Sequence, residues 1–159
     1  MLRAIRTVPK ETSSAAFAIV ASKYNGRYVD AMVKAALREL KKAGAKVEVI
    51  RVPGAFEIPA VVSALASGTR NTQHATRPSA IICFGVIFQG QTSHAEQIGT
   101  GVTHALAQIQ VEQRIPVIHG VFVFEKEEYA VIRCLGKKHN RGTEAAHTAL
   151  EMAQVMRSL

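Results

Sequence analysis

Four short apolar runs recur along the chain, separated by longer segments with helical periodicity. The runs are Phe17–Ser22, Lys46–Val52, Ala80–Phe88 and Val117–Phe124. Each has the length of a β-strand. The second run alternates apolar and polar residues, as in a strand with one wetter face, whereas the third is apolar almost throughout, as in a buried strand. The pattern predicts four strands.

Helices are predicted between and after these strands. The expected ranges are Asp30–Ala43, Glu57–Ala66, Ser93–Gln113, Lys126–Leu135 and Gly142–Arg157. Gly44 and Gly68 stand past two of the helix ends, and Pro59 fits the first turn of its helix. Strands that alternate with helices imply right-handed crossovers between parallel strands. The expected fold class is therefore α/β, a four-stranded parallel sheet covered by helices on both faces.

A chain of 159 residues suits one domain. We expect an N-terminal arm over residues 1–16, a single domain over 17–159 and a polar surface loop over Gly68–Ser79. The longest apolar run is much shorter than the ~18 residues of a membrane span. The N-terminus lacks the apolar core of a signal peptide, so we expect a cytoplasmic protein without membrane contact.

The formal net charge of +8 raises the alternative of a nucleic-acid partner. The basic residues are spread along the chain, however, without interleaved aromatics or a recognised nucleic-acid motif. The two cysteines, Cys83 and Cys134, form no disulfide framework. Cys83 lies inside an apolar run and is expected to be buried, whereas Cys134 follows Arg133 on a predicted helix. No metal site is expected, because the six histidines are scattered and His94 and His104 do not share a helix face.

Candidate chemistry gathers where the predicted strands end, which is where such sheets bind ligands. After the third strand comes Gly90-Gln91-Thr92-Ser93-His94, with Ser93 and Glu96 spaced as a capping box. His94 then takes the first helical position, where free N–H groups suit an anion and the helix dipole favours a neutral imidazole. A plain capped helix with a surface histidine is the competing interpretation.

Two further segments end in polar or aromatic groups. After the second strand, Pro53-Gly54 predicts a turn with free backbone groups, and Glu57 would either complement a helix dipole or hold ligand hydroxyls. Tyr24, after the first strand, would stack on a planar ring or simply pack.

Near the C-terminus, Arg133, Arg141 and Glu144 surround a helix junction. The junction suits a phosphate, since arginine binds phosphate bidentately. Its competing interpretation is a solvated basic surface.

Together, "VPGAFEIP", "GVIFQGQTSH" and "NRGTEAA" resemble the lumazine synthase family in order, spacing and element type, from Phe17 to the C-terminus. The resemblance implies a flavodoxin-like α/β/α sandwich and a homo-oligomer built from pentamers, with active sites between subunits. It implies condensation of 5-amino-6-(ribitylamino)uracil with 3,4-dihydroxy-2-butanone 4-phosphate to 6,7-dimethyl-8-ribityllumazine, a step of riboflavin biosynthesis. These small-molecule substrates react there without a cofactor, and riboflavin synthase is a candidate partner.

The resemblance also implies residue roles. His94 would transfer protons, Glu144 would assist it, and Tyr24 would stack on the pyrimidine. The ribityl chain would be held by Ala55, Phe56 and Glu57, and the ring pocket would be lined by Val86, Ile87 and Phe88. Phosphate would be held by Gln91 and Thr92, with Arg133 from a neighbouring subunit.

Several positions depart from the family pattern. Arg141 stands where lysine is usual, His119 where a ring-contacting phenylalanine is common, and Ala95 replaces a frequent aromatic. Two alternatives to the enzyme stay open: a protein that stores riboflavin or a lumazine, and a purely structural shell subunit. Pentamer, pair of pentamers and sixty-subunit shell are also not distinguished.

Overall fold

The computed structural model describes residues 15–68 and 76–159. The strands are β1 (Ala16–Ser22), β2 (Lys46–Val52), β3 (Ala80–Phe88) and β4 (Val117–Phe124). The helices are α1 (Gly26–Lys42), η1 (Ala55–Glu57), α2 (Ile58–Ser67), α3 (His94–Gln113), α4 (Glu127–Ala130), η2 (Val131–Leu135) and α5 (Arg141–Ser158). Here η1 is a 3₁₀ turn and η2 a π-helical turn.

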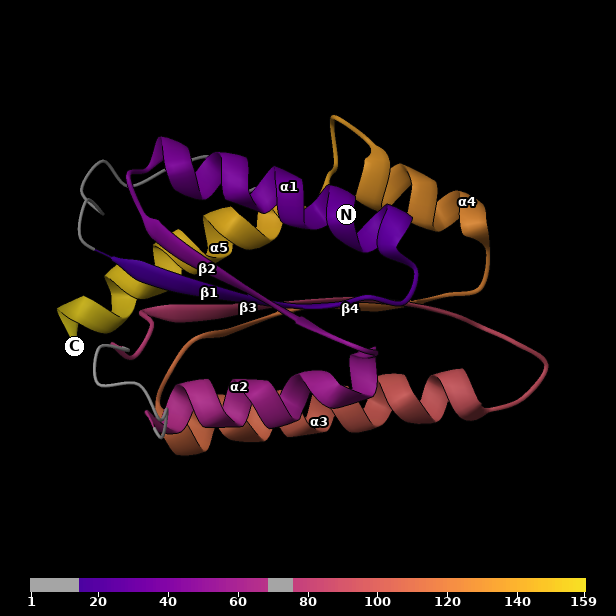
Figure 1. Cartoon of the computed structure of the whole chain (residues 1–159), viewed down its shortest axis with the longest axis horizontal. Coiled ribbons are helices and arrows are strands. Elements are labelled where there is room, and N and C mark those ends of the chain that lie inside the picture. The colour runs from indigo at the N-terminus through magenta and orange to yellow at the C-terminus, as the bar shows by residue number, and fades with distance from the viewer. Residues whose placement is uncertain (1–14, 69–75) are drawn as a thin grey trace.

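All strand pairs are parallel, and the sheet order is β2-β1-β3-β4. Helices α1, α4 and α5 cover one face, whereas α2 and α3 cover the other (Figure 1). The predicted three-layer α/β/α sandwich is confirmed. Because the chain leaves β1 toward one edge and β3 toward the other, the carboxyl ends of β1 and β3 form the switch point at which such folds bind ligands.

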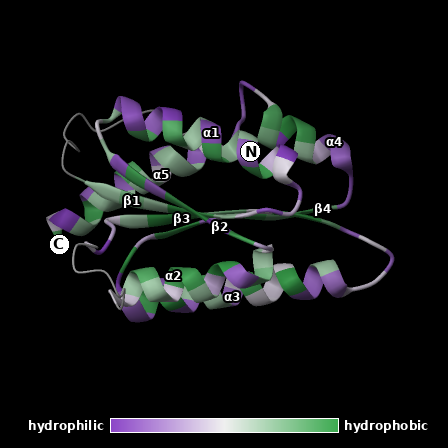
Figure 2. Ribbon diagram, in the orientation of Figure 1, coloured by the Kyte–Doolittle hydropathy of each residue, from purple (hydrophilic) through white to green (hydrophobic). Residues whose placement is uncertain are grey.

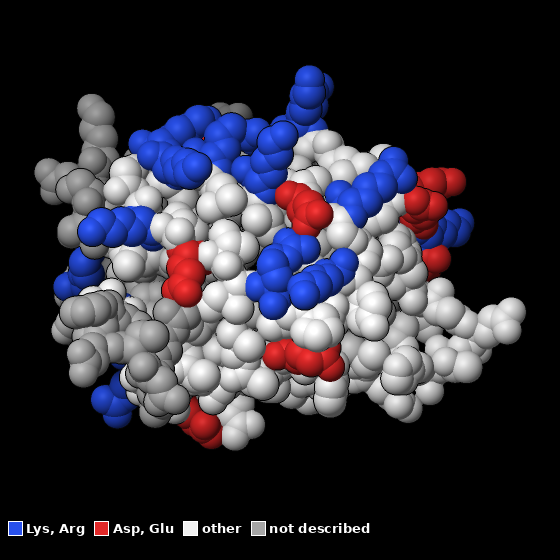
Figure 3. Space-filling view, in the orientation of Figure 1, with Lys and Arg blue, Asp and Glu red and all other residues white. Residues whose placement is uncertain are grey.

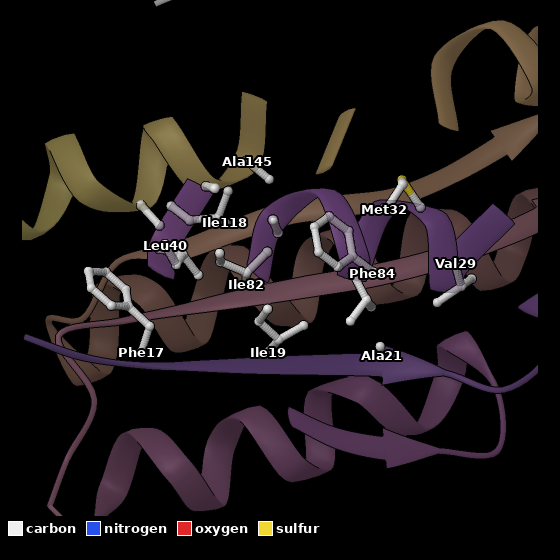
Figure 4. Close-up of a cluster of buried hydrophobic side chains, with 14 of the residues drawn as sticks. Phe17, Ile19, Ala21, Val29, Met32, Leu40, Ile82, Phe84, Ile118 and Ala145 are labelled. Atoms are coloured by element: carbon white, nitrogen blue, oxygen red, sulfur yellow. The ribbon is translucent and has the colours of Figure 1, made fainter. Parts of the chain in front are cut away.

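Two apolar cores lie on the two faces of the sheet. Figure 2 shows hydrophobic residues along the central strands, whereas β2 alternates hydrophobic and hydrophilic residues. The larger core fills the space between the sheet and α1 and α5, where Phe17, Ile82 and Phe84 meet Met32 and Leu40 (Figure 4). The smaller core joins the sheet to α2 and α3. Since successive strand residues point to opposite faces, β1 and β3 feed both cores and are buried along most of their length.

Helices α1 and α5 approach each other closely. A Cβ atom on Gly142 would collide with the backbone carbonyl of Met32, so only glycine permits this contact. Beside it, His147 Nε2 lies 3.3 Å from Glu39 Oε2. Lys42 Nζ donates to the other Glu39 oxygen at 3.1 Å. The Glu39 carboxylate of α1 therefore contacts one side chain of its own helix and one of α5.

The predicted strand ranges agree with the structure to within one residue, but two of the predicted helices differ from it more strongly. The first starts at Gly26 instead of Asp30, because Asn25 adopts a left-handed conformation (φ 56°) and turns the chain directly into the helix. The range Lys126–Leu135 is not one regular helix, since α4 widens into the π-helical turn η2 at Val131.

Some expectations fall outside the described residues. Of the predicted arm only Ala15 and Ala16 are described, and Ala16 already belongs to β1. Residues 69–75 of the predicted surface loop are likewise outside. No helix in the described ranges is both long and apolar enough to cross a bilayer.

Candidate active site

Asn25 joins the carboxyl ends of the two central strands. It follows β1, and its Nδ2 donates to the carbonyl of Val86 on β3 at 2.8 Å. The left-handed backbone of Asn25 leaves its amide free to reach across the sheet instead of capping α1. This bond closes the base of the switch point, so a ligand would lie outside it.

Tyr24, Gly54 and Glu57 come together at this edge. A Cβ atom on Gly54 would lie 2.8 Å from Glu57 Oε2 and 3.1 Å from Tyr24 Cδ2, so glycine leaves room for both side chains. The Tyr24 ring is 70% exposed and available to a planar ligand. The Glu57 side chain is exposed as well, with one oxygen accepting from Gly54 N at 2.8 Å.

The turn at Pro53-Gly54 does not leave its backbone groups free, contrary to expectation. The Gly54 N–H is taken by Glu57, and the Pro53 carbonyl accepts from the N–H groups of Lys23 and Tyr24, both at 3.2 Å. These bonds fix the turn against β1. The second Glu57 oxygen and the exposed side chains of this segment remain open to a ligand.

Phe56 and Ala55 lie beside α3. The Phe56 ring is 64% exposed, and a Cβ atom on Gly101 of α3 would lie 4.0 Å from its Cε2. Ala55 is buried beneath it, and a Cβ atom on Gly85 of β3 would come within 3.2 Å of the Ala55 methyl group. The short η1 turn thus fills the gap between β3 and α3 and presents one aromatic ring to solvent.

His94 is the first residue of α3, as predicted, and its side chain is exposed. The predicted Ser93–Glu96 capping box is wrong: Ser93 makes no side-chain cap bond in the described structure, because its backbone (φ −70°, ψ 1°) is not the extended form that a cap needs. Thr92 Oγ1 instead accepts from His94 N at 3.4 Å, and Ser93 Oγ accepts from Gln97 Nε2 at 3.2 Å. Gln91 and Thr92 are exposed beside His94, so the loop offers hydroxyl and amide groups at a helix N-terminus.

The three ring-pocket residues at the end of β3 point to different faces of the sheet. Val86 and Phe88 pack into the larger core, whereas Ile87 packs against the smaller one. This alternation follows from the strand geometry. Their side chains therefore do not line a single wall within one chain.

His119 lies away from the carboxyl edge of its own chain. It pairs with Cys83 in the sheet, five residues before Phe124, which is about 16 Å along a strand. Its Nε2 is 2.9 Å from Thr103 Oγ1, and that hydroxyl donates its only hydrogen to Gly99 O at 2.7 Å. Nε2 must then donate to Thr103, and burial lowers the pKa of His119, which keeps this ring neutral.

A hollow runs beside His119, between α3 and the edge strand β4. Its volume is about 500 Å³, and its lining includes Glu96, Thr103 and His104 from α3 and Val121 and Val123 from β4. No other strand covers β4 in the described sheet. The hollow is thus open along a sheet edge.

Arg133, Arg141 and Glu144 form a separate group on the α1/α5 face. Arg133 is exposed on η2. Arg141 Nη1 pairs with Glu144 Oε2 at 2.5 Å, and its guanidinium lies 5.9 Å from the centre of the Phe122 ring. In Figure 1 the sheet separates η2 and α5 from α3, so one chain does not bring these residues to His94.

The comparisons with known proteins now bear on this site. Residues 14–157 match the sequence model of the 6,7-dimethyl-8-ribityllumazine synthase family. The chain belongs to this family. The 6,7-dimethyl-8-ribityllumazine synthase of Stenotrophomonas maltophilia is 38% identical over 149 residues, which cover 92% of each chain. That of Pyrococcus furiosus is 38% identical over 143 residues, 89% of this chain and 85% of its own.

Membership in the lumazine synthase family confirms the resemblance seen in the sequence. It does not assign the individual residues, whose roles remain predictions. The geometry groups them: Tyr24, Phe56, Glu57, Gln91, Thr92 and His94 lie at the carboxyl edge on the α2/α3 side or at the switch point. Arg133, Arg141 and Glu144 lie across the sheet, and His119 lies on its edge strand.

Sequence reasoning missed a polar pair beside Phe88. Tyr28 is 4% exposed, and its hydroxyl donates to Glu127 Oε1. This hydrogen bond, with burial and the Glu127 charge, raises the pKa of Tyr28, so the phenol stays a donor at neutral pH. The two residues are 99 positions apart in the sequence, so no local sequence pattern could have indicated their contact.

The charge distribution agrees with one sequence expectation. Figure 3 shows lysine and arginine side chains gathered over α1, on the face opposite α2 and α3. Lys41, Lys42 and Lys46 are exposed there, as expected of a solvated basic face. Cys83 is free and buried as predicted; Cys134 is free and buried as well, and burial raises its pKa to about 11 despite the Arg141 charge. Within residues 15–68 and 76–159, no cluster of three metal-ligating side chains occurs.

Proposed function

We propose that this chain condenses 5-amino-6-(ribitylamino)uracil with 3,4-dihydroxy-2-butanone 4-phosphate to give 6,7-dimethyl-8-ribityllumazine, releasing phosphate and water. Family membership over residues 14–157 supports the reaction. The observation that carries the site assignment is the meeting of Tyr24 and Glu57 across Gly54, at the sheet edge toward which the Gln91–His94 loop runs.

In this proposal the pyrimidine stacks on the exposed Tyr24 ring. Aromatic rings stack with centroids ~4.5–7 Å apart, and Tyr24 has no other ring against it in the described structure. The ribityl chain runs toward Ala55, Phe56 and Glu57, where the second Glu57 oxygen accepts from its hydroxyls. The phosphate of the four-carbon substrate binds Gln91, Thr92 and the N-terminus of α3.

The reaction joins an amine to a ketone, eliminates phosphate and closes a ring with loss of water. Each step moves a proton, and His94 is the imidazole beside the proposed phosphate position. Holding two substrates in register supplies much of the remaining acceleration, because it removes the entropy cost of their encounter.

Arg133, Arg141, Glu144 and His119 enter the site from a second copy of the chain. Their positions across the sheet or on its open edge support this, since none lies beside His94 of the same chain. We therefore infer a homo-oligomer with active sites between subunits, built on pentamers; riboflavin synthase remains a predicted partner. We also infer a cytoplasmic location, because two free, buried cysteines suit a reducing compartment.

Mixing both substrates with the protein tests the function directly. Lumazine fluorescence should rise with time, and His94→Ala should lower turnover roughly 10²-fold, the lower end of what a positioned proton-transfer group contributes. His104→Ala is the matched control, because His104 lies on the same helix about 15 Å further along. Wild-type turnover in His94→Ala would refute the role of His94, and absence of product from the wild type would refute the reaction and leave a storage protein.

A further inference from the structure

A polar link between Tyr28 and Glu127 joins α1 to α4, the short helix that leads into η2 and Arg133. We propose that this link is a positioning device: it holds Arg133 in the orientation in which it binds the phosphate in the site of the neighbouring copy. The inference rests on the proposed function. Tyr28 and Glu127 are positioning residues here, because neither is placed against substrate.

On one side the link reaches the ring pocket. Tyr28 lies in the first turn of α1, four residues after Tyr24. Its ring meets Phe88 edge to face, with centroids 5.5 Å apart and planes at 73°. Phe88 is the last residue of β3, and the loop that leads to His94 starts directly after it. A shift of Tyr28 would therefore displace Phe88 and the start of the loop that leads to His94.

On the other side the link reaches the Arg133 turn. Glu127 is the first residue of α4, which has only four residues and continues into η2, where Arg133 is exposed. Apart from η2, the main packing of α4 is on β4, and of its own residues only Ala130 is buried. Further on, Cys134 is buried, and its carbonyl accepts from Asn140 Nδ2 at 2.6 Å. The turn is thus fixed behind Arg133 by Cys134, and ahead of it by the buried Ala130 and by the Tyr28–Glu127 link. The turn η2 also packs against α1, so a displaced α4 would change how Arg133 is presented.

The hydrogen bond matters more than the ion pair beside it. Arg27 Nη1 lies 3.4 Å from the same Glu127 oxygen, but both side chains are about two-thirds exposed, and such pairs contribute little. The Tyr28 ring is buried, and Glu127 Oε1 accepts the hydrogen bond of its hydroxyl. If α4 moved away, the buried Tyr28 hydroxyl would lose its acceptor, and an unpaired buried hydroxyl costs free energy. The hydrogen bond therefore favours one position of α4, whereas apolar packing alone would allow several.

The link gives Tyr28 a specific kinetic signature. Tyr28→Phe keeps the ring against Phe88 but releases Glu127, so the Arg133 turn gains freedom while the ring pocket is preserved. We expect the KM of the butanone phosphate to rise about fivefold, with kcat and the KM of the pyrimidine changed less than about twofold. The inhibition constant of inorganic phosphate should rise by the same factor as that KM.

Two controls match this variant. Tyr129→Phe removes a hydroxyl from the same short helix, and Tyr129 is exposed and has no side-chain bond among those that the described residues make. It should leave every constant unchanged. Glu127→Ala breaks the link from its exposed side and should reproduce the effect of Tyr28→Phe, whereas the neighbouring Glu128→Ala should not.

Equal rises in both KM values, or a lower melting temperature with unchanged KM values, would overturn the positioning role. The failure of the proposed function is separable from this outcome. If the wild type forms no lumazine, calorimetric titration with inorganic phosphate still tests the link: weaker binding by Tyr28→Phe and Glu127→Ala than by Tyr129→Phe supports it, and equal or absent binding refutes it.

Discussion

At the scale of single residues, short polar contacts decide which candidate groups stay free for a ligand. One carboxylate oxygen of Glu57 accepts a hydrogen bond from Gly54 N, and the other oxygen remains open to a ligand. Thr92 takes the capping contact that the sequence had suggested for Ser93. His119 is held as a donor by Thr103, whose hydroxyl is committed to Gly99. Each of these outcomes depends on one hydrogen-bond partner 2.7–3.4 Å away, and a small displacement of that partner would break the bond.

Glu39 gives a pH-dependent prediction at this scale. Burial raises the pKa of its carboxyl, but hydrogen bonds from Lys42, His147 and Arg38 outweigh burial and hold the pKa below the usual 4.5. A lowered pKa contributes stability that is present above the unfolded value and is lost as pH falls through the folded one. Wild type should therefore exceed Glu39→Gln in free energy of unfolding at neutral pH, by roughly 1 kcal/mol at most because solvent reaches the network.

Urea titrations between pH 7 and pH 3 measure this difference. The gap between wild type and Glu39→Gln should shrink as the pH falls below 4.5, the ordinary pKa of the carboxyl in the unfolded chain, and should close once the folded carboxyl is also protonated. Glu128→Gln, on an exposed turn of α4, should show no such change. A gap that stays constant with pH would contradict the assigned cause.

At the scale of elements, close helix contacts and the π-helical turn orient the polar groups. Gly142 lets α5 approach α1, and Asn140 caps α5 by accepting from Gly142 N at 2.9 Å while donating to the Cys134 carbonyl. One side chain therefore connects the end of η2 to the start of α5. Arg133 and Arg141 are positioned by the same junction.

Two glycine-to-alanine substitutions distinguish the effect of the close α1–α5 contact on stability from the effect of helix propensity. Gly142→Ala should lower the free energy of unfolding by about 1–3 kcal/mol, because its methyl group would push α5 away from α1. Gly101→Ala, inside α3 with its nearest neighbour 4.0 Å away, should leave stability unchanged or raise it by up to ~1 kcal/mol. Equal effects in thermal or urea unfolding would show that the helix contact does not limit this site.

At the scale of the whole molecule, the sheet divides the proposed site into two halves. His94 belongs to the α2/α3 side, and Arg133 to the α1/α5 side (Figure 1). A complete site then needs the His94 half of one copy and the Arg133 half of another. This division is why the oligomer is part of the proposed function.

Subunit complementation tests that division. His94→Ala and Arg133→Ala should each have low activity alone at limiting phosphate substrate. When the two are co-expressed in equal amounts, about a quarter of the sites would combine an intact His94 with an intact Arg133, so activity should recover toward one quarter of wild type. Light scattering on the same samples gives the assembly size. No recovery in mixed oligomers would place both residues in one chain's site.

Local patterns were enough to predict most of the fold. The bounds of Lys46–Val52, Ala80–Phe88 and Val117–Phe124 agree with β2, β3 and β4, because apolar runs of strand length between turn residues have few other solutions. Helix starts were harder: Asn25 and the Thr92–Ser93 pair begin helices in ways that depend on contacts with β3 and on the loop conformation. The π-helical turn at Val131 has no local signal in this sequence.

The sequence by itself determined the class of fold, the family and the sheet edge where the candidate chemistry gathers. Those properties follow from periodicity and from motifs of adjacent residues. Only the tertiary structure decided that Ile87 faces away from Val86 and Phe88, that His119 and Arg133 lie apart from His94, and that Tyr28 reaches Glu127. The physical reason is that these relations depend on which faces of the sheet the helices cover and on contacts between residues far apart in the chain.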